Sequence, residues 1–126
     1  MFDEKKQIVY WKTTALDNME TAEILFEKGK YRECLFFCHL TIEKLLKAHF
    51  VKTQKDFAPK VHNLEYLYSK TNLILPELYY DFLPKVMVYN IEGRYPDYDF
   101  PQPSKETADQ YIKMSKEIIE WLLQKL

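Results

Sequence analysis

The segment from residue 90 to residue 103 combines an arginine with aromatic and acidic side chains in a chain that must run extended. It reads N-I-E-G-R-Y-P-D-Y-D-F-P-Q-P. Pro96, Pro101 and Pro103 fix their own φ, and each disfavours helical backbone in the residue before it. Because loops that rigid helices present often bind ligands, Arg94 is a candidate binding residue. The structural alternative is that Arg94 neutralises a helix carboxylate while the aromatic rings close one edge of the core.

A second candidate group is His39, Glu43 and Lys47, which are spaced by four residues. On a helix they form one stripe, where the Lys47 ammonium could meet a nucleotide or an RNA end while Glu43 orients an arginine. Glu43 is therefore the first candidate partner of Arg94. The same spacing is typical of i,i+4 pairs on a half-exposed face, and spacing alone favours this second interpretation.

The histidines are the natural candidates for acid–base chemistry near neutral pH. His49 lies in the centre of an apolar stripe, which is typical of a core residue with a satisfied ring. His62 starts a short helix, and its neighbour Asn63 can cap backbone donors of that helix. For His62, a functional role and a capping role both stay open.

The sequence contains no G-x-x-x-x-G-K-[ST], G-x-G-x-x-G, H-E-x-x-H or C-x-x-C motif. P-loop ATP hydrolysis, Rossmann cofactors and zinc hydrolysis are therefore not expected, and we predict no cofactor and no metal. Cys34, Cys38 and His39 cannot converge on a metal, because adjacent residues of a helix point about 100° apart. Two cysteines one turn apart predict buried free thiols.

The chain has 126 residues and a mass of 15.3 kDa, so we expect a single domain over residues 1–126 with its own core. Hydrophobic residues make up 47 % and there are only two glycines, which argues against disorder and against a turn-rich β fold. The formal net charge of −1 lacks the basic excess of a duplex-binding protein.

Charge is uneven along the chain. Residues 44–62 carry five lysines against Asp56 alone, whereas residues 92–109 carry five acids against Arg94 and Lys105. Solvated helix ends, a local anion site and a contact between the two regions would each explain this pattern.

Apolar residues recur at helical spacing over residues 8–28, 31–52, 77–91 and 105–125, with a shorter helix over 62–71. Gly29 ends the first pattern, and Ser104 is a candidate N-cap of the last. Short connections between amphipathic helices predict an all-α, antiparallel up-and-down bundle of four to five helices. The expected core-facing residues include Ala15, Met19, Ala22, Leu35, Ile42, Leu45, Leu67, Leu78, Phe82, Val86, Ile118 and Leu122.

No apolar run approaches the ~20 residues that cross a bilayer, so we expect a cytoplasmic protein without membrane contact. Aromatic residues make up 16 %, with ten tyrosines and eight phenylalanines. A bundle of this size buries only part of them, and such a surplus is typical of an interface. The composition therefore predicts a homodimer.

Three blocks in this order resemble the HEPN domain family of small prokaryotic proteins: C-H-L-T-I-E-K-L-L-K-A-H at 38–49, V-H-N-L-E-Y-L at 61–67 and R-Y-P-D-Y at 94–98. The resemblance spans nearly the whole chain. It implies a helical bundle that often forms homodimers and is encoded beside, or fused to, minimal nucleotidyltransferases, frequently in toxin–antitoxin-like arrangements. Nucleotide or RNA binding is implied as well. The ligand-binding candidates it gives are Glu43, Lys44, Lys47, His62, Arg94, Tyr95 and Asp97.

Some branches of that family are metal-independent ribonucleases with an R-x(4–6)-H motif near the start of the last helix. Here Tyr-Pro-Asp-Tyr-Asp-Phe follows Arg94, and no histidine follows His62. Arg32 and His39 match the spacing only inside the second helix, which we treat as coincidence. We therefore expect a non-catalytic or weakly catalytic binding protein and assign no catalytic residue. The alternatives are a divergent ribonuclease using His62 and Arg94, and an interaction module that dimerises and masks a partner.

Overall fold

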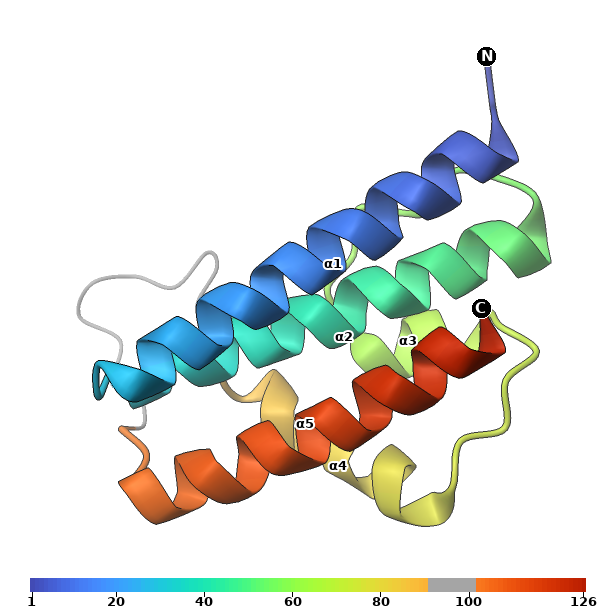
Figure 1. Cartoon of the computed structure of the whole chain (residues 1–126). Coiled ribbons are helices and arrows are strands. Elements are labelled where there is room, and N and C mark those ends of the chain that lie inside the picture. Colours follow the sequence, from blue (N-terminus) through green and yellow to red (C-terminus); the bar gives the residue numbers. More distant parts are fainter. Residues whose placement is uncertain (91–101) are drawn as a thin grey trace.

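The computed structural model describes residues 1–90 and 102–126. Helices and loops make up these ranges, without any strand, so the all-α prediction is confirmed. The helices are α1 (Glu4–Glu27), α2 (Tyr31–Gln54), α3 (Leu64–Ser69), α4 (Glu77–Met87) and α5 (Lys105–Lys125). Figure 1 shows their arrangement.

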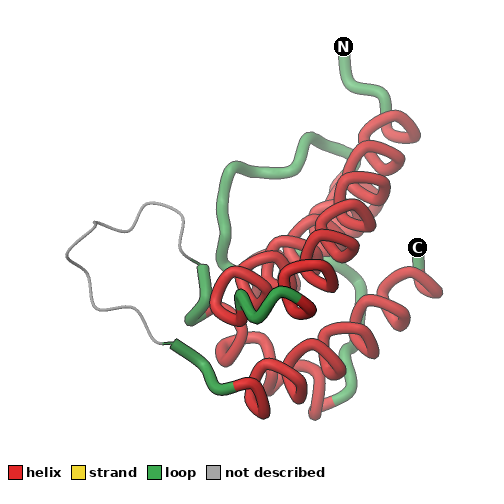
Figure 2. The backbone as a smooth tube through the Cα atoms, turned by 60° about the vertical axis from the view of Figure 1, so that its left-hand side comes forward, coloured by secondary structure: helices red, strands yellow, loops and turns green. Residues whose placement is uncertain are grey.

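Helix α2 is the centre of the bundle and contacts α1, α3, α4 and α5. It forms an antiparallel hairpin with α1, the short α3 and α4 then lead the chain back, and α5 runs in the direction of α2 (Figure 1). Both termini therefore lie at the same end of the bundle, as Figure 2 also shows. Because these neighbours cover most of α2, a polar side chain on a covered side of the helix must find its partners inside the fold.

The α1–α2 hairpin begins and turns where local chemistry requires it. Helix α1 begins at Glu4, earlier than the predicted residue 8, because the Asp3 carboxylate accepts from the Lys6 N–H at 3.1 Å and caps the helix. The predicted end at Gly29 is confirmed. Gly29 has a φ of 74°, a left-handed conformation that glycine adopts without the strain of a side chain.

Two of the later caps were correctly predicted. The Asn63 side chain accepts from the Tyr66 N–H at 2.9 Å, and the Ser104 hydroxyl accepts from the Thr107 N–H at 3.1 Å. Helix α3 is shorter than the predicted range 62–71, because it begins only after the Asn63 cap. It follows that His62 itself is outside the helix.

The predictions for α4 need two corrections. The helix ends at Met87, whereas residue 91 was predicted, because the Tyr89 N–H bonds to the Val86 carbonyl in a tight turn. Leu78, predicted to face the core, is 62 % exposed. The face of α4 that packs inward is centred one residue further along, and it consists of Tyr79, Phe82, Leu83 and Val86.

The core is continuous and apolar around α2. Cys34 and Cys38 are buried in it as free thiols, which confirms the prediction made for them. No helix in residues 1–90 or 102–126 combines the length and the apolar character that a membrane span requires.

Candidate functional site

Glu43 places a carboxylate inside the bundle at the middle of α2. Its Oε2 lies 3.2 Å from the Lys47 ammonium, and its Oε1 lies 3.1 Å from Nδ1 of His62. His39, Glu43 and Lys47 are all buried, so the half-exposed face that their spacing suggested is wrong. The reason is coverage from two sides: α1 packs over Lys47, and the connection after α2 packs over Glu43.

His62 reaches Glu43 because the chain reverses after α2. Lys55 ends the helix in a left-handed conformation with a φ of 56°, and its N–H bonds to the Val51 carbonyl at 2.9 Å. The connection over residues 55–63 then returns along α2 before α3 begins. A residue 19 positions after Glu43 is thereby brought to its side.

His39 and Glu43 together fix both the backbone and the ring of His62. Nε2 of His39 lies 3.2 Å from the carbonyl oxygen of His62, and since a carbonyl only accepts, this nitrogen is the donor. The Glu43 carboxylate likewise only accepts, so Nδ1 of His62 carries the proton it donates. The His62 side chain remains 44 % exposed, whereas the Glu43 side chain is 4 % exposed.

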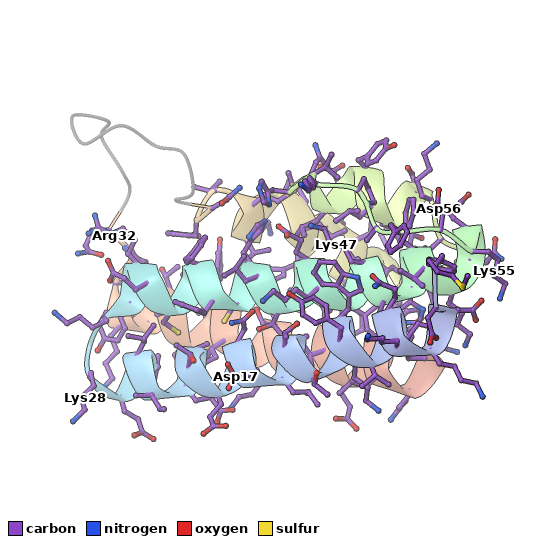
Figure 3. The ribbon with its side chains drawn as sticks, turned by 90° about the horizontal axis from the view of Figure 1, so that it is seen from above. Asp17, Lys28, Arg32, Lys47, Lys55 and Asp56 are labelled. Atoms are coloured by element: carbon purple, nitrogen blue, oxygen red, sulfur yellow. The ribbon has the colours of Figure 1, made fainter. Side chains whose placement is uncertain are left out.

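Lys47 belongs to the interior of this arrangement and lies near the middle of the α1–α2 hairpin (Figure 3). Its ammonium lies 5.2 Å from the centre of the Trp11 ring, in addition to its ion pair with Glu43. A cation facing an aromatic ring is stabilised by the ring quadrupole. The Lys47 ammonium thus contacts Glu43 and Trp11 inside the fold, and its role here is to balance the charge of Glu43.

The remaining sequence-predicted residues divide into two groups. Lys44 is half-buried on the neighbouring face of α2, about 100° around the helix from Glu43. Arg94, Tyr95 and Asp97 lie outside the described residues, so the pairing of Arg94 with Glu43 stays a prediction.

The contacts of His62 with Glu43 and His39 were missed by the sequence analysis. The spacing of His39 and Glu43 was visible, but their partner comes from a connection whose path no periodicity specifies. The one local signal was the capping role expected of Asn63, which in the structure leaves His62 just before α3.

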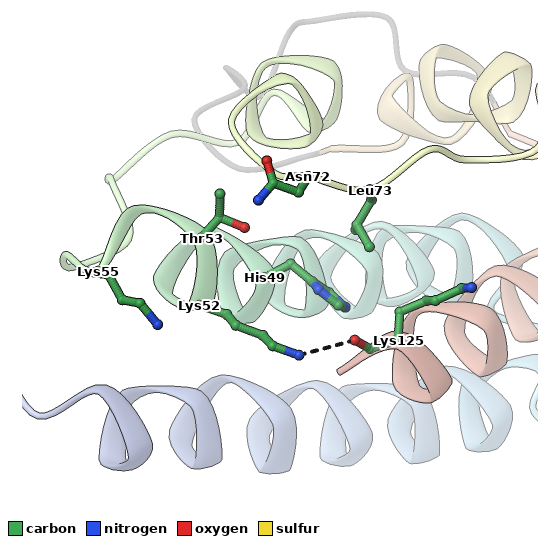
Figure 4. Close-up of a pocket in the computed structure, with 7 residues that line it drawn as sticks. All are labelled: His49, Lys52, Thr53, Lys55, Asn72, Leu73 and Lys125. Atoms are coloured by element: carbon green, nitrogen blue, oxygen red, sulfur yellow. Dashed lines mark hydrogen bonds between the residues drawn. The ribbon is translucent and has the colours of Figure 1, made fainter.

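A cavity of about 410 Å³ lies at the C-terminal end of α2 (Figure 4). It is lined by His49, Lys52, Thr53, Lys55, Asn72, Leu73 and Lys125. Its lysines all have partners. The Lys52 ammonium donates to the Leu126 carbonyl at 2.9 Å, Lys55 pairs with Glu4 at 2.9 Å, and the Lys125 ammonium lies 5.3 Å from the Trp121 ring centre. Part of the basic excess over residues 44–62 is therefore engaged within the fold.

His49 is a core residue, as predicted. It is buried, and its Nε2 donates to the Leu122 carbonyl of α5 at 2.9 Å. Burial lowers the pKa of its ring below the ordinary value of 6.5, since desolvation disfavours the charged form, and the nearby Lys52 ammonium lowers it further. His49 thus stays neutral at neutral pH and ties the ends of α2 and α5 together.

A carboxylate that holds one ring nitrogen of a histidine fixes the tautomer and the orientation of the ring. Such a ring can transfer a proton, or it can pair with an anion when it is protonated. Within residues 1–90 and 102–126, no three His, Cys, Asp or Glu side chains are grouped so that they could hold a metal ion. The chemistry that the Glu43–His62 contact itself provides is that of an oriented imidazole.

Two crystal structures are similar to this chain. TT1696 from Thermus thermophilus superposes with a TM-score of 0.80 at 20 % identity, covering 95 % of this chain and 98 % of TT1696. ST0689, described as an archaeal HEPN homologue, gives a TM-score of 0.64 at 18 % identity, covering 94 % and 96 %. At such identities the likeness shows the fold alone. No curated protein matches the chain.

The HEPN domain model matches residues 8–126, which is nearly the whole chain. The match includes α2, the connection that carries His62, and α5. The chain therefore belongs to the HEPN domain family.

Proposed function

We propose that this HEPN protein binds a nucleotide or an RNA end at the surface around His62. In this proposal Arg94, Tyr95 and Asp97 contribute from their loop, and Lys44 contributes from the neighbouring face of α2. Glu43 and Lys47 are buried beneath this surface and do not contact the ligand: Glu43 orients His62, and Lys47 balances the charge of Glu43. The observation that carries the proposal is the attachment of a half-exposed His62 to His39 and Glu43.

The attachment matters because a fixed side chain loses little conformational entropy when a ligand binds. An exposed histidine without such contacts would have to be ordered at the cost of binding free energy. A protonated imidazole and an arginine both donate to phosphate oxygens, and a tyrosine ring can stack on a base. These residue types together favour a phosphate-bearing ligand with a base.

The partner we propose is a minimal nucleotidyltransferase in a toxin–antitoxin-like arrangement in the cytoplasm. This part rests on the family resemblance. Co-expression with the product of an adjacent reading frame tests it when that frame encodes such an enzyme. Co-purification of the two proteins is expected, and their separation at low salt would contradict the proposal.

Fluorescence anisotropy with a labelled single-stranded RNA and with labelled nucleotides tests the binding proposal. We expect His62→Ala and Arg94→Ala each to weaken binding by about tenfold or more, since each removes a charge-assisted contact. Lys113→Ala is the matched control, because Lys113 is an exposed cation on α5 that pairs with Asp109. Equal binding by all four proteins, or no binding by the wild type, would contradict the proposal.

The second candidate is a divergent ribonuclease that uses His62 with Arg94. The observation that favours it is the Glu43–His62 contact, since a carboxylate that orients an imidazole also supports general acid–base catalysis. Against it stands the sequence after Arg94, which lacks the histidine of the R-x(4–6)-H motif. Cleavage assays distinguish the two candidates.

A further inference from the structure

The cavity at the C-terminal end of α2 contains hydrogen-bonding groups that the fold itself does not use. Its volume of about 410 Å³ is within the ~300 to 1,000 Å³ of typical small-molecule sites. His49, Thr53 and Asn72 line it together with Leu73 (Figure 4). None of these four residues takes part in the Glu43–His62 contact, so the cavity is a separate place on the molecule.

His49 supplies an acceptor to the wall of the cavity. Its Nε2 donates to the Leu122 carbonyl, and the lowered pKa keeps the ring neutral at neutral pH, so Nδ1 carries a lone pair. Among residues 1–90 and 102–126, Nδ1 finds no hydrogen-bond donor, although only 3 % of His49 is exposed. Polar atoms of buried side chains usually have a partner. Here the partner can come from a ligand in the cavity.

The Thr53 hydroxyl is also uncommitted. Threonine hydroxyls in helices often donate to the carbonyl four residues earlier, as Thr41 of the same helix does to the Phe37 carbonyl at 2.8 Å. In the described part of the chain Thr53 makes no such bond, and the Asn72 amide has no hydrogen-bond partner either. Figure 4 shows the two side chains directed toward each other on the side of the cavity above His49. Together they offer donors and acceptors to one ligand.

Lys52 and Lys55 make the edge of the cavity basic. The Lys52 ammonium donates to the carbonyls of Lys125 and Leu126 at 3.3 and 2.9 Å, which uses two of its three donors. Lys55 pairs with Glu4, but its side chain is 64 % exposed, and an exposed ion pair is weak enough to be exchanged. Over the described ranges, Glu4 is the only side-chain carboxylate that pairs with either lysine. Both ammonium groups can therefore still donate to an anion.

We propose that this cavity binds a sugar phosphate, with its hydroxyls at His49, Thr53 and Asn72 and its phosphate at Lys52 and Lys55. A sugar hydroxyl can donate to Nδ1 of the imidazole, and other hydroxyls can both donate to and accept from the threonine and the amide. Phosphate oxygens accept charge-assisted hydrogen bonds from ammonium groups. The proposal does not rest on the nucleotide or RNA site around His62.

Leu73 completes the fit. Figure 4 shows its side chain directed toward His49, where it gives the cavity one apolar wall. The carbon-bound hydrogens of a sugar ring can pack on such a wall while its hydroxyls bond elsewhere. A plain anion would leave the acceptor of His49 unpaired, and an uncharged sugar would leave both lysines unused. The combination of hydroxyls and a phosphate uses every group described.

Isothermal titration calorimetry of the full chain with glucose 6-phosphate and with ribose 5-phosphate tests the proposal. We expect at least one of them to bind with a Kd of about 1 mM or lower. Glucose and inorganic phosphate should each bind at least about tenfold more weakly, since each lacks one half of the contacts. The proposal would be overturned if neither sugar phosphate bound below about 10 mM. Equal binding of inorganic phosphate would also overturn it, since the site would then select only charge.

Thr53→Val and Asn72→Ala locate the ligand. Each should weaken binding about fivefold, because each removes a hydrogen-bonding group. Neither side chain has a partner in the described structure, so both variants should fold, and thermal melting checks this. Thr21→Val is the matched control, since it removes a hydroxyl of α1 that donates to the Asp17 carbonyl. It should leave the affinity unchanged.

His62→Ala should also leave the affinity for the sugar phosphate unchanged, which separates this site from the proposed nucleotide or RNA site. Unchanged binding by both Thr53→Val and Asn72→Ala would place the ligand elsewhere and overturn the proposal.

Nitrogen NMR of the histidine rings provides a second measurement that does not depend on affinity. A ligand hydroxyl that donates to Nδ1 of His49 should shift the ¹⁵N resonance of that atom, because a bare imidazole nitrogen is sensitive to a new hydrogen bond. The signal is assigned by its disappearance in His49→Gln. The rings of His39 and His62 serve as internal references and should not change. A bound sugar phosphate that leaves the His49 resonance unmoved would contradict the proposed position.

Discussion

Glu43 and His62, 19 positions apart in the chain, meet at 3.1 Å between a carboxylate oxygen and the ring nitrogen Nδ1. One partner is buried in the bundle and the other is half-exposed. The contact therefore connects the interior of the bundle to its surface. Changes at Glu43 should act on stability through Lys47 and on ligand binding through His62.

Glu43→Ala should destabilise the protein by about 3 to 5 kcal/mol, because it leaves the Lys47 ammonium buried without its counter-charge. Urea denaturation measures the loss. Adding Lys47→Met to Glu43→Ala should recover part of it, since the uncompensated charge is then removed. Glu120→Ala, an exposed carboxylate on α5, should change the stability by less than about 0.5 kcal/mol. A loss of similar size at both positions would contradict the buried ion pair.

Arg94→Ala distinguishes the two roles left open for this arginine. If Arg94 pairs with a buried carboxylate such as Glu43, its removal should cost about 3 to 5 kcal/mol. A loss of this size, together with coupling to Glu43→Gln in a double-mutant cycle, would make Arg94 a structural residue and remove it from the ligand contacts proposed above. A loss below about 1 kcal/mol would instead indicate an exposed arginine available to a ligand.

The stability should fall as pH falls below about 6.5, in part because of His49. Its pKa in the folded protein lies below the ordinary value of 6.5. Between these two values the unfolded chain binds the proton more readily, so protonation favours unfolding and stability increases with pH. One such group contributes a slope of up to about 1.4 kcal/mol per pH unit. Urea midpoints between about pH 5 and about pH 7.5, a window around the ordinary histidine pKa, measure this slope.

His49→Gln is the variant that isolates this effect. Its amide can still donate to the Leu122 carbonyl, but it does not titrate. The variant should show a shallower decrease at low pH than the wild type. An identical pH profile would mean that other groups cause the acid sensitivity.

The purified chain should not cleave single-stranded RNA at a meaningful rate. In-line transesterification needs a proton donor or acceptor with a pKa near neutral and a cation for the phosphorane charge, and proton transfer alone contributes ~10² to 10⁴-fold. No histidine follows His62, and tyrosine, with an ordinary pKa near 10, is a poor substitute. Only His62 could supply the proton donor or acceptor.

Labelled RNA incubated with the wild type, His62→Ala and Arg94→Ala provides the measurement. Cleavage by the wild type that both substitutions abolish would overturn this prediction in favour of the ribonuclease. Glu43→Gln would then reduce the rate as well, because it weakens the contact that orients His62.

The sequence alone determined the helices, several of their caps and the burial of His49. These features depend on local chemistry: helical periodicity, the left-handed conformation of Gly29, and the side chains of Asn63 and Ser104. The errors at the ends of α1 and α4 also have local causes, namely the Asp3 cap and the tight turn after Met87. An error of a few residues there leaves the architecture unchanged.

Only the tertiary structure decided what the stripe of His39, Glu43 and Lys47 does. Spacing placed the three side chains on one side of α2, but it could not tell whether that side is covered. Trp11 from α1 and His62 from the returning connection cover it, and both come from parts of the chain distant in sequence. Burial depends on which segments pack against a helix, and periodicity within that helix carries no information about its neighbours.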